Sequence, residues 1–152
     1  MNLKHLILSA NILISCIVLT LVPVKSYAIE MLFIVANVND QEQTLTKRDI
    51  KNIFLGELRT FPSGEAAKPI VQAIGSQSRL LFMDKIINKT ESKWRAHWAR
   101  LLFTGKGTPP EEISNKNELL EMVSKNKGAV GYFVGNRMES DGVKVLMALP
   151  VD

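Results

Sequence analysis

The sequence is nearly free of the two side chains that build disulfides and most metal sites. Among 152 residues, only Cys16 is a cysteine, and only His5 and His97 are histidines. A lone cysteine excludes a disulfide within the chain, and a lone histidine after residue 28 excludes the histidine and cysteine sets that bind zinc. His97 stands between two tryptophans, and no strand-turn nucleophile signature of a hydrolase accompanies it. We therefore predict no cofactor, no metal and no enzyme activity, and a packed or surface position for His97.

Long apolar runs are also scarce, apart from one at the N-terminus. Lys4 precedes an apolar stretch over residues 6–24, and small residues at 26 and 28 suit a signal peptidase. We interpret residues 1–28 as a cleaved secretory signal, which predicts a periplasmic protein. Two alternatives stay open: the stretch is retained as a membrane anchor, or Cys16 carries a lipid in a bacterial lipoprotein pattern.

A strong charge excess is missing as well. Lys4 and Lys25 fall in the predicted leader, so the formal net charge of +4 drops to +2 over residues 29–152. This balance does not favour nucleic acid or an anionic membrane as a partner. The length of residues 29–152 suits one domain with a core of ordinary size, and we see neither a repeat nor a second domain boundary.

Hydrophobic periodicity in this domain alternates between the strand and the helix pattern. Thr46 with Asp49 three residues later matches a capping box at a helix N-terminus. Thr90 and Ser114 are predicted to cap the next helices. We predict strands over residues 31–38, 69–74, 129–134 and 143–149, with helices near 46–56, 78–87, 90–104 and 114–127. Alternating strands and helices predict an α/β domain whose parallel strands are joined by helices. Trp94 and Trp98 share an apolar helix stripe, which favours a core position.

The best place for chemistry is the turn after the second predicted strand. In open α/β sheets, ligands bind where a strand leads into the N-terminus of a helix. Gly75 lets the backbone approach a ligand, and the free amides at the start of the helix point outwards. Ser76 and Ser78 add hydroxyl groups, and Arg79 adds a cation. These residues predict a site for a small oxyanion, although the same pattern fits a serine N-cap followed by a solvated arginine.

The order of three short signatures resembles the phosphate-binding proteins of ABC transporters. These signatures are Ile53-Phe-Leu-Gly56, the Gly75–Phe82 segment, and Gly128-Ala-Val-Gly-Tyr132. The resemblance covers most of residues 29–152 and is closest to short phosphate-binding-like proteins. It implies a single lobe, the second, of a type II periplasmic-binding fold, with a mixed sheet flanked by helices.

The resemblance also implies where phosphate would bind. Counting back from Phe82 places Ser76 on the family's serine, Gln77 on its glycine, Ser78 on its threonine and Gln72 on its arginine. Two positions depart from the family, because Gln77 adds a side chain and Gln72 removes a bidentate cation. We infer that Arg79 supplies the missing charge from the next turn.

Two function hypotheses follow. The first is a secreted solute-binding-like protein that binds phosphate or a similar oxyanion weakly, linked to an ABC transporter and its membrane permease. The second is a periplasmic interaction or sensory module that keeps the fold without the ligand. Its partner would be a sensor protein, an envelope complex or a second copy of the chain in a homodimer.

Overall fold

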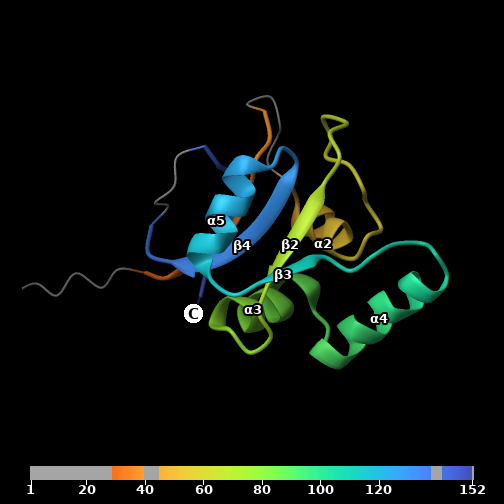
Figure 1. Cartoon of the computed structure of the whole chain (residues 1–152). Helices are drawn as coiled ribbons and strands as arrows, with labels where there is room; N and C mark the ends of the chain where they lie inside the picture. The colour runs from red at the N-terminus through yellow and green to blue at the C-terminus, as the bar shows by residue number, and fades with distance from the viewer. Residues whose placement is uncertain (1–28, 40–44, 138–141, 152) are drawn as a thin grey trace, which may run out of the picture.

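The computed structural model describes residues 29–39, 45–137 and 142–151. The predicted leader and its alternatives, the membrane anchor and the lipidated Cys16, lie outside these residues. The described chain forms a five-stranded mixed sheet between two helical layers (Figure 1). The predicted α/β class with a mixed sheet is confirmed.

The strands stand in the order β3-β2-β4-β1-β5 across the sheet. Their bounds are Met31–Ala36 for β1, Lys68–Gln72 for β2, Glu111–Ile113 for β3, Ala129–Gly135 for β4 and Lys144–Pro150 for β5. The short β3 was not predicted. Two of its three residues are exposed glutamates, so Ile113 alone gives it a buried side chain and no apolar pattern is visible.

Strand direction corrects one expectation. β2 pairs in parallel with β4, as predicted, and also with β3, which was not predicted. β1 instead runs antiparallel to both of its neighbours, β4 and β5. An alternation of strand and helix along the chain does not fix which strands become neighbours. Here β4 lies between β1 and β2. The helix that follows β1 therefore connects two strands that are not neighbours in the sheet.

Helices cover both faces of the sheet. Their bounds are Lys47–Phe54 for α2, Gln77–Phe82 for α3, Met83–Ile87 for the π-helical η1 that continues it, Glu91–Phe103 for α4 and Lys116–Lys125 for α5. The predicted capping box of Thr46 and Asp49 and the Thr90 cap are confirmed. The predicted Ser114 cap is wrong, because the Asn115 side chain accepts from the Glu118 amide and the helix begins one residue later.

The larger hydrophobic core lies between the sheet and α2, α3, η1 and α4, and the smaller one lies beneath α5. Phe82 stacks on Tyr132 with ring centroids 3.8 Å apart, and Phe54 packs edge-on against Phe82 at 4.6 Å. Trp94 and Trp98 are 4% and 6% exposed, which confirms their predicted core position. The His97 ring is half-buried and donates to the Leu55 carbonyl at 2.8 Å, so it fastens α4 to the end of α2.

Tyr132 makes this core sensitive to alkaline pH. Burial raises the pKa of the Tyr132 hydroxyl from 10.0 to about 12. The unfolded chain releases this proton first as the pH rises, so the stabilisation is complete below pH 10 and is lost between pH 10 and 12. We expect the unfolding free energy to fall by about 2–3 kcal/mol over this window in urea titrations. Tyr132→Phe should lack this component, and an equal decline in that variant would contradict the prediction.

Candidate functional site

The predicted anion site is formed where β2 leads into α3. β2 ends at Gln72, and the Ala73 amide donates to the Ile113 carbonyl, which closes the strand against β3. Ser76 then caps α3, because its side-chain oxygen accepts from the Arg79 amide at 3.2 Å. The Leu80 amide donates to the Ser76 carbonyl as the first backbone bond of the helix. The predicted cap role of Ser76 is confirmed.

Two backbone donors remain at this helix start. The first amides of a helix have no acceptor within it, and the Ser76 cap satisfies only the Arg79 amide. The Gln77 and Ser78 amides have no acceptor among the described residues. The helix dipole places partial positive charge at the same point. The arrangement can therefore bind a small anion through backbone N–H groups.

The side chains around these amides are largely engaged. The Ser78 hydroxyl is buried and accepts from the Val134 amide at 3.0 Å, which ties α3 to β4. The Gln77 side chain is exposed and donates to the Glu30 carboxylate at 3.2 Å. Ser76 and Gln77 thus stay near the surface, whereas Ser78 serves the packing of the helix.

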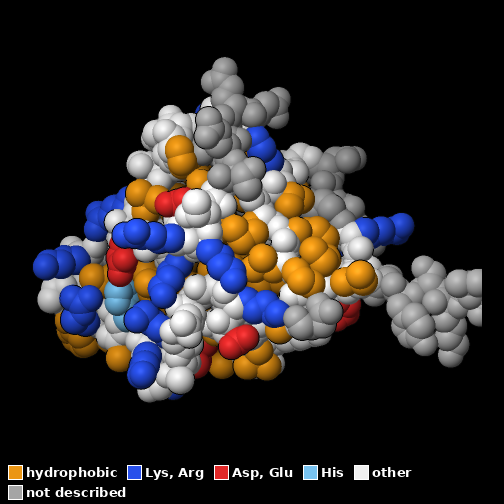
Figure 2. Space-filling view, turned by 180° about the vertical axis from the view of Figure 1, so that it is seen from behind, with side chains coloured by type: hydrophobic (Ala, Val, Ile, Leu, Met, Phe, Trp, Pro, Cys, Tyr) orange, Lys and Arg blue, Asp and Glu red, His pale blue; other side chains and the backbone are white. Residues whose placement is uncertain are grey.

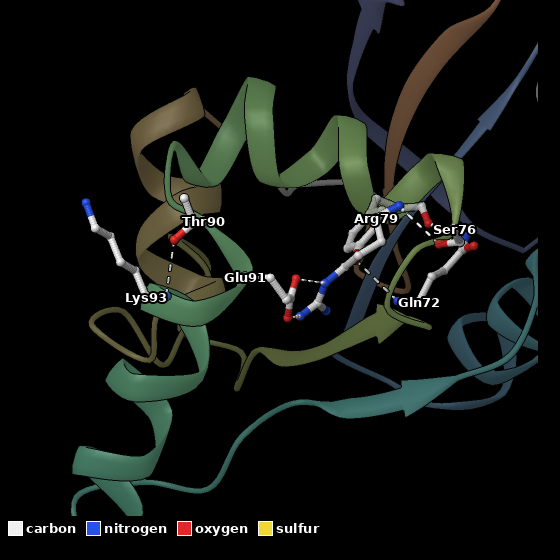
Figure 3. Close-up of polar contacts among 7 residues, drawn as sticks. Gln72, Ser76, Arg79, Thr90, Glu91 and Lys93 are labelled. Carbon is white, nitrogen blue, oxygen red and sulfur yellow. Dashed lines mark hydrogen bonds and ion pairs between the residues drawn. The ribbon is translucent and has the colours of Figure 1, made fainter.

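Arg79 lies in an enclosed position. It is 2% exposed, so the alternative of a solvated surface arginine is wrong. Its guanidinium donates twice to the Glu91 carboxylate, from Nη2 at 2.7 Å and from Nε at 3.1 Å. The guanidinium carbon also lies 5.2 Å from the ring centroid of Trp94. Figure 3 shows the side chain running from α3 towards Glu91, away from Ser76.

Electrostatics explain why this buried cation is retained. Burial has the largest single effect and opposes the charge of Arg79, but the combined attraction of Glu91 and Tyr132 outweighs it, so the pKa of Arg79 is raised. The Nη1 atom is buried without a hydrogen-bond partner among the described residues. Because its charge is already matched by Glu91, Arg79 reaches a ligand only if the ligand replaces that carboxylate. A role for Arg79 in anion binding stays a prediction.

Gln72 stands where the resemblance to phosphate-binding proteins implies an arginine. It is 4% exposed, and its side-chain nitrogen donates to the Tyr132 carbonyl at 2.8 Å. The Gln72 backbone amide also donates to the Tyr132 hydroxyl at 3.3 Å. The side chain is therefore part of the contact between β2 and β4 (Figure 3).

The sequence gives no signal for two features of the structure. Glu91 is the first residue of α4, where an acidic residue suits the helix dipole, and no spacing signal links it to Arg79. The second is a groove at the opposite end of the sheet, formed by segments distant in sequence.

Across the described segments, no three histidine, cysteine, aspartate or glutamate side chains gather into a set that could hold a metal ion. In the same segments, every helix is too short or too polar to cross a bilayer.

Comparison with known proteins identifies the fold. No protein-family model and no curated protein matches the chain. Among solved structures, a protein described as a phosphate ABC transporter substrate-binding protein from Clostridium perfringens, solved with bound phosphate, matches with a TM-score of 0.60 and 16% identity. The match covers 78% of this chain and 44% of that one.

A second match is an ABC-type phosphate transport receptor from Vibrio cholerae, with a TM-score of 0.58 and 17% identity over 78% of this chain and 46% of that one. The chain therefore shares the fold of phosphate substrate-binding proteins and spans less than half the length of these neighbours. That share is consistent with the predicted single lobe.

Proposed function

We propose that the protein is a periplasmic, single-lobe solute-binding-like protein that binds phosphate or a similar small oxyanion weakly. The site consists of the Gln77 and Ser78 amides with the Ser76 hydroxyl, and Arg79 joins it when its guanidinium releases Glu91 and turns to the anion. The observation that carries the proposal is the pair of amides without acceptors at the start of α3. The fold shared with a phosphate-bound neighbour supports the choice of ligand.

Weak binding follows from the openness of the site. Gly75 and Gln77 are exposed, so an anion at these amides keeps part of its contact with water. Each hydrogen bond then contributes less than it would in an enclosed, low-dielectric site. The likeness to transport receptors supports a link to an ABC transporter and its permease, with the predicted leader directing export.

Gln77→Pro tests the role of the backbone. Proline is favoured at the first position of a helix, and the extended backbone of Ser76, with ψ of 148°, suits the residue before proline. The change therefore removes one amide donor and leaves the helix intact. We expect calorimetry to show millimolar phosphate binding in the wild type and affinity about fivefold weaker in Gln77→Pro.

Gln77→Ala is the matched control, since it loses the same side chain and its bond to Glu30 but keeps the amide. It should bind phosphate as the wild type does. Equal affinity of the proline and alanine variants would exclude the amide site, and no phosphate heat in the wild type would exclude the function.

A second candidate function is an interaction module, and the exposed end of α4 favours it. Phe103 is 90% exposed and Leu102 is 52% exposed, next to one another at the last turn of the helix. α4 also lies at the side of the molecule rather than over the middle of the sheet (Figure 1). Large apolar side chains in such a position are typical of protein contacts. The absence of phosphate heat in the wild type would favour this function over phosphate binding.

A further inference from the structure

A groove lies at the end of the sheet opposite to the anion site. It is lined by the first residues of β2, β3 and β4, whereas Ser76 follows the end of β2. Because these three strands are parallel, the groove and the start of α3 lie at opposite ends of them. Its volume is about 480 Å³, within the range of small-molecule sites.

The walls of the groove are apolar and come from distant parts of the chain. Ile53 of α2, Ile70 of β2 and Met122 of α5 line it together with Trp98 of α4 and Pro109. The Trp98 indole nitrogen is buried without a hydrogen-bond partner among the described residues. A buried donor without an acceptor is rare in proteins, and it sets this wall apart from ordinary core packing.

The charges on the groove are mostly of one sign. Arg59, Lys68 and Lys106 are exposed and line it, and Glu111 is its single acidic side chain. None of the three cations belongs to a salt bridge that the described residues form. The Arg59 guanidinium donates to the Lys106 carbonyl, which holds a cation against the loop before β3. Figure 2 shows basic side chains gathered over the α4 half of the molecule.

We propose that this groove binds a small molecule with an apolar body and one anionic group, such as a medium-chain carboxylate. The apolar walls accept the body, and the Lys68 and Lys106 ammonium groups attract the anion. Neither the site nor its ligand depends on the proposed phosphate binding, because the two sites share no residue.

Three probes of equal chain length test the charge requirement: octanoate, octanol and octylammonium. We expect octanoate to bind one per chain in calorimetry and to change the fluorescence of Trp98. Octylammonium should bind at least about tenfold more weakly. Equal affinity for octanoate and octylammonium would overturn the proposal.

Variants of the groove test its location. Lys68→Gln combined with Lys106→Gln should weaken octanoate about five- to tenfold and leave octanol unchanged, since each exposed charge contributes modestly. Lys93→Gln is the matched control, because Lys93 lies on the first turn of α4 outside the groove. Octanoate affinity that is unchanged in the double variant would contradict the role of the cations.

Gly107→Leu fills the groove. A Cβ atom at Gly107 would meet the Trp98 ring at 3.5 Å, an ordinary van der Waals distance, so the backbone tolerates the change. We expect loss of both octanoate and octanol binding with an unchanged circular dichroism spectrum. Octanoate binding that persists in a folded Gly107→Leu protein would overturn the proposal. If this variant does not fold, the lysine variants still decide the outcome.

Discussion

Gly128→Ala is expected to destabilise the protein by about 3 kcal/mol or more, a large part of the stability of an ordinary domain. Gly128 has a φ of +77°, a conformation that alanine adopts only with strain. A Cβ atom at this position would also lie 2.1 Å from the Ala66 carbonyl oxygen. The obstacle is backbone, so a side-chain movement cannot relieve it.

The surroundings of Gly128 prevent the chain from moving away. Its amide donates to the Asn37 carbonyl and its carbonyl accepts from the Lys68 amide, both at 2.8 Å. These bonds join the end of β1, the start of β2 and the start of β4. A shift of Gly128 would therefore weaken the sheet at the point where its central strands meet.

Gly64→Ala separates the two causes. Gly64 has a φ of +86° and no atom within 4 Å of an added Cβ, so this variant carries the backbone strain without the collision. We expect a loss of about 1–2 kcal/mol for Gly64→Ala in urea unfolding, clearly smaller than for Gly128→Ala. Equal losses in the two variants would mean that the contact with Ala66 has no energetic role.

The features that the sequence predicts well are those decided within one turn of chain. The Thr46 and Asp49 capping box requires only two residues three apart, and the Ser76 cap follows the same rule. Gly128 is visible as a stop after α5, but the nearby Ala66 carbonyl is not, because the two meet only in the folded sheet.

The state of the anion site depended on distant contacts, and these could not be predicted. Arg79 suits an oxyanion by its chemistry, and nothing near it in sequence indicates that Glu91 matches its charge. The burial of Ser78 likewise arises from Val134, 56 residues away. The groove is assembled from six elements and the loops between them, so no single segment carries a signal for it.

Glu91→Gln is expected to have two opposite effects, a loss of stability and a gain in phosphate affinity. The substitution keeps the shape of the side chain and removes the charge that faces Arg79. Breaking a buried pair leaves the remaining charge uncompensated, and because the Glu91 side chain is 26% exposed we expect a loss of about 2–3 kcal/mol. Urea unfolding of the purified variant measures this loss.

A double-mutant cycle identifies the charge as the cause. Arg79→Met removes the cation and its contact with Trp94, and it leaves a carboxylate that still reaches water. In the Arg79→Met background, Glu91→Gln should then cost little, since no buried charge remains to be compensated. If Glu91→Gln costs the same with and without Arg79, the ion pair contributes nothing beyond the packing of the two side chains.

The gain in affinity follows from the geometry of the pair. The Glu91 carboxylate occupies two donors of Arg79 in the bidentate manner that a phosphate would use, so it competes with the proposed ligand. In the Glu91→Gln variant the guanidinium lacks a counter-charge, and we expect phosphate to bind about tenfold more tightly and to recover part of the lost stability. Phosphate affinity that is unchanged in Glu91→Gln but reduced in Gln77→Pro would confine the site to the helix amides and exclude Arg79.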